Sequence, residues 1–279
     1  CTWLKTARSA GSTLYTFDPL LPGVGDDPFS YVAVGDDVYF CSETVSGVVD
    51  KNDVVSRWGE EVSPGQWLSP VVNPTETLGE VRGKLLGKPP MASAVAYWNG
   101  RIYLAHGTTV WATELYLYHY VDKTKNYLQF EAPVTMLATV TDGVYVGTTE
   151  AVYFLTGTFK ELKRIPLMHY GAIARSAVDV PAELIKPQIQ QDPQSPIRNA
   201  VLFLTKTGLC AGFDNGVIYN LTQADVLFPD AVSAAPMFRR QDGVNQYIGV
   251  LDNAGTPSSN TRIGDYVSVE IRRFQGASQ

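Results

Sequence analysis

The chain has 279 residues, of which 18% are charged and 11% aromatic, with 24 Gly and 17 Pro. This composition is typical of a compact, turn-rich, β-leaning protein and excludes a disordered or coiled-coil chain. The formal net charge of −6 and the pI of about 5.1 argue against a general nucleic-acid surface. No apolar run approaches the ~18 residues of a membrane span.

The three cysteines, Cys1, Cys41 and Cys210, form no CxxC pair. This usage indicates a reducing compartment or three buried small side chains. The first ten residues lack the apolar core of a signal peptide, and the chain begins with Cys rather than Met. We therefore expect a segment of a longer protein.

Short β-rich runs separated by turn residues begin near the N-terminus. A strand is predicted at 12–17, and four more follow at 29–35, 36–42, 47–49 and 53–59. The stretch 60–90 holds five prolines and four glycines, and it is interpreted as an insertion.

The region 92–168 carries the clearest pattern. Asn99-Gly100 predicts a type I′ hairpin turn, and Asp142-Gly143 predicts another turn before two further strands that end at Thr156. An outer strand is predicted at 159–168. The run 115–120 is apolar on both faces, so we expect a strand covered on both sides.

The C-terminal part repeats the pattern after a second Pro-rich insertion at 180–199, which contains a short helical turn at 182–186. Strands are then predicted at 200–207, 208–212, 217–221, 236–240, 246–251 and 266–272.

Five residues mark the same position after a turn in successive units: Tyr39, Tyr103, Tyr145, Cys210 and Tyr247. Their separations are 64, 42, 65 and 37, and each long interval contains one insertion. The short intervals match the ~40–50 residues of a four-stranded propeller blade. We predict one all-β, propeller-like domain over 1–279 with about five to six blades; a β-sandwich or stacked β domains is the alternative.

Residues that carry chemistry form no recognisable motif. The histidines His106, His119 and His169 are widely spaced, so no metal site is predicted. A glycosidase would need two carboxylates close together, and four acidic residues could supply them: Glu114, Asp142, Glu150 and Asp214. Nothing in the sequence singles out a pair, and we predict no catalytic, cofactor-binding or metal-binding residues.

The remaining candidates are aromatic and basic side chains. The aromatic residues could fill the core, contact a partner or stack on sugars, with the core favoured: Trp58, Trp67, Trp98, Trp111, Tyr116, Tyr118 and Tyr120. The doublets Arg239-Arg240 and Arg272-Arg273 are interpreted as solvated strand ends.

Several runs resemble tailed-bacteriophage virion proteins, in particular the propeller-bearing tail nozzle or tail-accessory proteins of short-tailed phages. They are 47–59, 99–116, 142–157 and 208–222, within a resemblance that spans roughly residues 30 to 250. The resemblance has no catalytic residues to transfer. It implies a ring-forming structural protein of the tail or neck, involved in DNA ejection and assembled in the bacterial cytoplasm.

Two functions follow as expectations. The first is a non-enzymatic virion protein, whose propeller is a rigid platform in a homo-oligomeric ring beside neighbouring tail or portal proteins. The second is a propeller at the tail tip that binds or cleaves host surface glycans. A convergent cluster of carboxylates or aromatic side chains would favour the second.

Overall fold

A computed structural model describes residues 2–9, 12–19, 28–52, 54–59, 61–63, 66–67, 86–185, 199–222, 227–228, 231–241, 244–253 and 266–270. Within these ranges the regular secondary structure is almost entirely antiparallel β-strand, as the composition predicts. No helix in them is long and apolar enough to cross a membrane.

Most strands form five sheets, each built from strands consecutive in the chain except where β13 is skipped. The first sheet contains β3 (Ser30–Val34), β4 (Asp37–Cys41), β5 (Ser46–Val49) and β6 (Val55–Arg57). The second contains β10 (Ala94–Trp98), β11 (Arg101–His106), β12 (Thr109–Ala112) and β14 (Tyr127–Gln129). The third contains β15 (Val134–Val140), β16 (Gly143–Thr148), β17 (Val152–Thr156) and β18 (Lys163–Met168).

The fourth sheet contains β19 (Val178–Pro181), β20 (Asn199–Thr205), β21 (Gly208–Gly212) and β22 (Ile218–Asn220). The fifth has three strands, β23 (Ala231–Gln241), β24 (Val244–Asn253) and β25 (Tyr266–Glu270). Three two-stranded pairs lie outside these sheets: β1 (Thr2–Ser9) with β2 (Ser12–Pro19), β7 (Glu61–Ser63) with β8 (Gln66–Trp67), and β9 (Leu86–Gly87) with β13 (Val121–Asp122). The helical pieces are η1 (Phe159–Glu161), α1 (Ala182–Ile185) and η2 (Asp214–Gly216).

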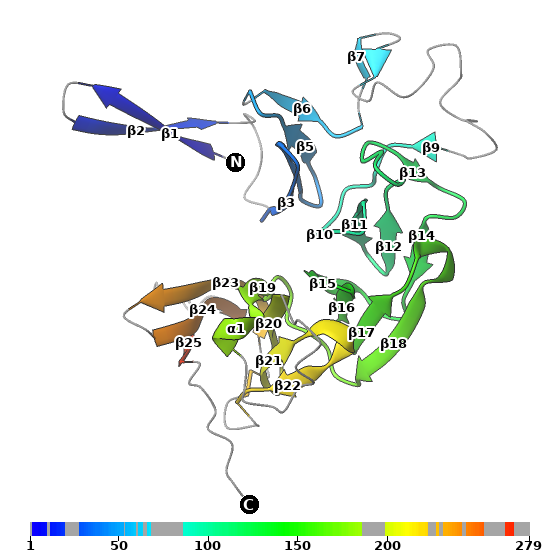
Figure 1. The fold of residues 1–279 in the computed structure, drawn as a ribbon, viewed down its shortest axis with the longest axis vertical. Coiled ribbons are helices and arrows are strands. Elements are labelled where there is room, and N and C mark those ends of the chain that lie inside the picture. Colours follow the sequence, from blue (N-terminus) through cyan, green and yellow to red (C-terminus); the bar gives the residue numbers. More distant parts are fainter. Residues whose placement is uncertain are drawn as a thin grey trace, which may run out of the picture.

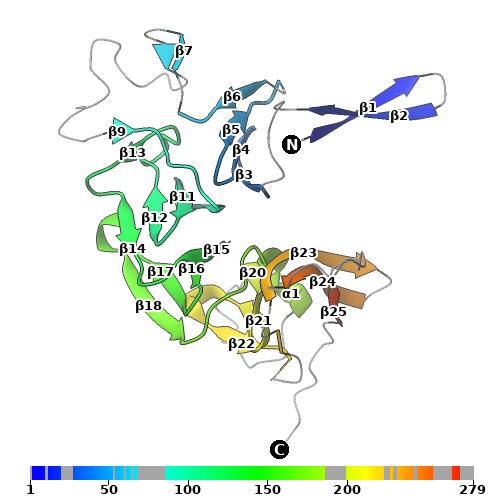
Figure 2. The ribbon, with the colours of Figure 1, turned by 180° about the vertical axis from the view of Figure 1, so that it is seen from behind.

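The five sheets follow one another around an open arc, with the first and last sheets at its two ends (Figures 1 and 2). Their first strands line the inside of the arc, because β3 packs on β10, β10 on β15, β15 on β19 and β19 on β23. The predicted all-β, propeller-like class with about five four-stranded units is confirmed. The sandwich alternative is wrong, since the sheets pack in series rather than as two layers.

The innermost strands run in the same direction. Val95 N–H near the start of β10 donates to Ser30 Oγ at the start of β3 over 3.0 Å. Trp98 Nε1–H at the end of β10 donates to the carbonyl of Thr141, just after β15, over 3.3 Å. The first strands of neighbouring sheets are therefore parallel, with the start of one strand beside the start of the next. This is the arrangement expected when sheets of the same topology pack face to face.

Apolar side chains fill the four spaces between neighbouring sheets. Each space has its own cluster, centred on Tyr39 and Ile102, on Tyr103 and Val144, on Tyr145 and Phe203, and on Leu202 and Tyr247. Burying one such side chain contributes about 1.5–3 kcal/mol. The core is therefore a chain of interfaces between sheets, which fixes each sheet to its neighbours.

All five marker residues are buried, and four of them lie on the second strand of a sheet: Tyr39, Tyr103, Tyr145 and Tyr247. Cys210 lies on β21, the third strand of the fourth sheet, so the predicted register of the repeat is wrong by one strand there. The directions of the five side chains differ. Tyr39, Tyr103 and Tyr145 face the next sheet in the chain, whereas Cys210 and Tyr247 face the previous one. In the fourth sheet Leu209 takes the forward position. Side chains alternate along a strand, so a shift of one residue reverses the face.

The predicted type I′ turn is confirmed, because Asn99 and Gly100 have φ of +49° and +75°. The predicted strand over Leu115–Tyr120 is wrong. This segment folds over the turn instead, with Tyr116 at φ +58° and its N–H donating to the carbonyl of Gly100 over 2.9 Å. Any side chain at Gly100 would collide with Leu115 and Tyr116.

The predicted outer strand at 159–168 begins with η1, and its β-structure is confined to β18. The helical turn predicted at 182–186 is confirmed as α1. Of the two predicted insertions, residues 60, 64–65, 68–85 and 186–198 lie outside the described residues.

Candidate functional site

Asp142 and Asp214 are the two predicted carboxylates that the fold brings together. Asp142 follows β15 in the turn to β16, and Asp214 begins η2 between β21 and β22. Asp214 Oδ1 accepts the backbone N–H of Thr141, and Asp142 Oδ2 accepts the backbone N–H of Asn215, both over 2.8 Å. Each carboxylate thus binds the backbone beside the other one, and the pair joins the third sheet to the fourth.

Burial raises the pKa of Asp142 above its ordinary value, and the negative charge of Asp214 raises it further. The hydrogen bond from Asn215 acts in the opposite direction. Asp142 Oδ1 is buried without a hydrogen-bond partner. Two carboxyl groups in this position favour retention of a proton by one of them. The pair therefore links the two turns, because each carboxylate already accepts a hydrogen bond from a backbone N–H of the other turn.

The other two predicted carboxylates lie elsewhere. Glu114 is buried and its Oε1 accepts a hydrogen bond from Asn126 Nδ2 over 2.8 Å within the second sheet. Glu150 is exposed in the turn between β16 and β17. The structure therefore assembles no set of three or four from these residues.

The histidines are also separate. His106 and His169 are exposed, and His106 Nδ1 lies 2.9 Å from the carbonyl of Met91. Burial lowers the pKa of His119, whose Nδ1 has no hydrogen-bond partner. Within the part of the chain that the structure describes, no three His, Cys, Asp or Glu side chains gather in a way that could hold a metal ion.

Most predicted aromatic candidates fill the spaces between sheets. Trp58, Trp98 and Tyr120 are buried, and Trp58 Nε1–H donates to the carbonyl of Tyr118 over 2.7 Å. Tyr118 is half-buried, with its ring 5.9 Å from that of Tyr97 and 5.7 Å from that of Tyr39. The core interpretation is confirmed for these residues.

Trp111 is half-buried and, like Tyr118, packs against the cluster between the first and second sheets; its ring centroid lies 5.4 Å from that of Tyr127. Two candidates differ from that pattern. Tyr116 is 68% exposed on the segment after β12, which covers the Asn99-Gly100 turn. The side chain of Trp67 lies outside the described residues.

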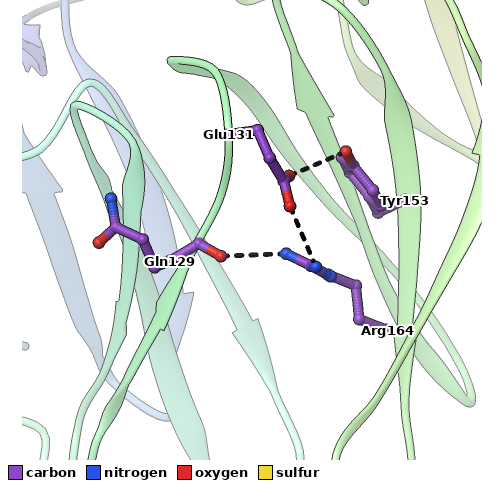
Figure 3. Close-up of polar contacts among 4 residues, drawn as sticks. All are labelled: Gln129, Glu131, Tyr153 and Arg164. Atoms are coloured by element: carbon purple, nitrogen blue, oxygen red, sulfur yellow. Dashed lines mark hydrogen bonds and ion pairs between the residues drawn. The ribbon is translucent and has the colours of Figure 1, made fainter.

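A polar network not predicted from the sequence joins the second and third sheets (Figure 3). Arg164 on β18 forms an ion pair with Glu131 over 3.2 Å and donates to the carbonyl of Gln129 over 3.0 Å. Tyr153 Oη–H donates to Glu131 Oε2 over 3.1 Å, and the Arg164 guanidinium lies over the rings of Phe130 and Tyr153. The groups are partly exposed, so the network orients two sheets rather than building a reaction centre.

The two described cysteines are buried between sheets. Burial raises the pKa of Cys41 to about 12 and that of Cys210 to about 11. Thiols with such pKa values stay protonated near neutral pH and react slowly. Cys1 and the Arg272-Arg273 doublet lie outside the described residues; Arg239 and Arg240 are exposed at the end of β23, as predicted.

Sequence reasoning missed the apolar residues that the arc leaves uncovered at its ends. On the first sheet Tyr31 is 74% exposed, and on the last sheet Met237 and Val250 are 53% and 48% exposed. Their strands show ordinary β-alternation, so no local signal distinguishes these faces from buried ones.

No known protein-family model and no curated protein matches the chain. Among solved structures, BBS1N in complex with ARL6DN has 12% identity and a TM-score of 0.44, covering 88% of this chain and 61% of that one. The N-terminal domain of Nup159 has 10% identity and a TM-score of 0.34, covering 85% of this chain and 53% of that one. The chain thus spans about three fifths and one half of their lengths.

Hsv2 of Kluyveromyces lactis has 10% identity and a TM-score of 0.35, covering 81% of this chain and 71% of that one. These similar proteins are β-propeller proteins. None of the three is a virion protein, and at such identities and TM-scores nothing about function follows from them. The resemblance to phage tail proteins stays a prediction.

Proposed function

We propose that the protein is a non-enzymatic assembly platform, and specifically a structural component of a phage tail or neck. The observation that supports this function is the use of the polar side chains: Asp142, Asp214, Glu131 and Arg164 connect neighbouring sheets. A surface that holds its position while loops and end faces contact neighbours suits an assembly role.

The virion part of the proposal is supported by the sequence resemblance to tailed-bacteriophage virion proteins. The chain would be assembled in the bacterial cytoplasm and contact neighbouring tail or portal proteins through its exposed parts. Leu115 and Tyr116, 47% and 68% exposed on the segment that covers the Asn99-Gly100 turn, are suited to such a contact. Exposed large apolar side chains gathered on one loop favour a protein partner.

Quantitative mass spectrometry of purified particles tests the function. We expect the chain in a fixed ratio to the major virion proteins, in particles that survive washing with salt. Absence from the particles would contradict the virion role.

A turnover assay on host polysaccharide tests the non-enzymatic part. We expect no sugar release above that of buffer. Release that disappears in Asp142→Ala and Asp214→Ala but persists in Glu150→Ala would overturn it and assign hydrolysis to the paired carboxylates.

A further inference from the structure

The two ends of the arc expose opposite faces of the same repeating arrangement. Inside the chain, the forward face of each sheet packs on the back face of the next one. The last sheet has no following sheet among the described residues, so its forward face is uncovered. The first sheet likewise has no preceding sheet of the arc on its back face (Figures 1 and 2), where Tyr31 is 74% exposed.

The forward face of the last sheet is apolar. The cross-strand pairs Ala235–Val250 and Met237–Ile248 point to this side, because their neighbours Ala234, Leu251 and Tyr247 pack on the fourth sheet. Arg239 continues the same face toward the end of β23.

The back face of the first sheet is apolar as well. Tyr31 and Ala33 are exposed there, whereas Phe40, opposite Tyr31 on β4, is buried and packs edge-on against the ring of Phe29. The alternate residues of the same strand, Val32 and Val34, pack toward the second sheet.

Charge distinguishes the two ends. Asp36 lies in the turn that follows β3, whereas Arg239 lies near the end of β23 on the forward face. Asp37 and Arg240 lie on the opposite faces, because their cross-strand partners Val34 and Asn245 contact the second sheet and the Leu184 carbonyl. Among the described residues, no ion pair uses Asp36 or Arg239. Two first sheets or two last sheets face to face would bring like charges together, which is unfavourable.

We propose that the forward face of the last sheet binds the back face of the first sheet in a second copy of this chain. The proposal deepens the assembly role and rests on it. Stacking with the geometry found between sheets inside the chain places β23 of one copy beside β3 of the next copy. Because the innermost strands run in the same direction, the end of β23 that carries Arg239 then lies near the turn that carries Asp36. Such a contact is head-to-tail, so it generates a ring or a filament.

Sedimentation velocity of the 279-residue chain from about 1 to 100 μM tests the contact. We expect concentration-dependent association that weakens as salt increases, because exposed charges are screened. Tyr31→Asp blocks the back face, and the double variant Met237→Asp/Val250→Asp blocks the forward face. Each variant alone should stay monomeric, whereas Ile165→Asp on β18 of the third sheet should associate like the parent chain.

Mixing the two blocked variants separates a head-to-tail contact from a symmetric one. Each variant keeps the face that the other has lost, so a 1:1 dimer that grows no further is expected. Association of either blocked variant with itself would overturn the proposal. So would a monomeric parent chain at every concentration.

Charge exchange gives a second test that does not depend on the apolar faces. Asp36→Arg and Arg239→Asp should each weaken association by about threefold or more, and the combination of both substitutions should restore it. Failure of the combined variant to recover, with an unchanged circular dichroism spectrum, would contradict the contact. Particle analysis is independent of this result, so failure of the virion role and failure of the docking surface are distinguishable.

Discussion

At the scale of single residues, the Asp142–Asp214 pair gives a prediction with a definite pH dependence. The pKa of Asp142 is raised in the folded protein, so protonation of this carboxyl group stabilises the fold. This contribution to the free energy of unfolding is complete below the unfolded pKa of about 3.8 and is lost as pH rises through the folded pKa. Asp142→Asn removes the buried charge and keeps an oxygen for the Asn215 N–H. We expect it to stabilise the protein at pH 7 by up to about 1 kcal/mol, reduced by the partial exposure of the side chain.

Urea unfolding at pH 7 and at pH 3 measures this effect. At pH 3 the gain should largely disappear, because both proteins then carry a neutral group at position 142. Asp142→Ala is the matched comparison, since it leaves the Asn215 N–H without its acceptor and should destabilise by about 1 kcal/mol. A pH-independent gain for Asp142→Asn would show that the carboxylate charge is not its cause.

The sequence contains the four candidate carboxylates but no signal for which two meet. Asp142 and Asp214 lie in turns of different repeats, and each turn accounts for an Asp by itself. Their pairing depends on how the third sheet packs against the fourth, which is a long-range property. Local sequence patterns therefore predicted the turns but not the pairing of Asp142 with Asp214.

At the scale of elements, Tyr145 on β16 tests how neighbouring sheets are joined. Its side chain is fully buried, and its hydroxyl donates to the carbonyls of Phe213 over 2.5 Å and Val217 over 3.1 Å. Tyr145→Phe removes the hydroxyl donor from the Phe213 carbonyl of the fourth sheet, whereas the Val217 carbonyl still accepts the N–H of Phe213 over 2.8 Å. We expect a loss of about 1–3 kcal/mol in the free energy of unfolding.

Denaturant unfolding followed by tryptophan fluorescence measures the loss. Tyr153→Phe is the control, because Tyr153 donates to the exposed Glu131 and its hydroxyl should contribute less than about 0.5 kcal/mol. Equal effects of the two substitutions would mean that the buried hydroxyl has no special part in joining the sheets.

Strands and turns were predictable because period-two alternation and Asn-Gly or Asp-Gly turns are local. The strand prediction for Leu115–Tyr120 was wrong because the backbone of this segment forms hydrogen bonds with its own neighbours and with Gly100. For example, Glu114 N–H donates to the carbonyl of Tyr120 over 2.8 Å. An apolar run alone does not reveal that choice. The short β9–β13 pair was missed for a similar reason, as its two strands are far apart in the chain.

At the scale of the whole molecule, the repeat spacing predicted the number of sheets but not the open arc. Spacing counts units along the chain, whereas closure depends on the angle between sheets and on what covers the end faces. Tyr31 and Met237 have the same apolar character as buried residues of other strands. Their exposure is a property of position in the arc.

The serial arrangement predicts a gradient of local stability. The third and fourth sheets pack on both sides, while the first and last sheets pack on one side. When each unit contacts only its neighbours, the end units open more readily than the middle ones. Hydrogen exchange at low protein concentration should therefore be slowest in β16 and β20 and faster in β3 and β23.

Raising the protein concentration should slow exchange selectively at the two end sheets if copies associate through them. The central sheets are already covered on both faces, so their exchange should change little. Tyr31→Asp removes the back-face contact and should abolish the concentration effect without altering the gradient. Uniform slowing along the whole chain would indicate global stabilisation rather than burial of the end faces, and equal protection of all five sheets in the monomer would contradict the serial packing itself.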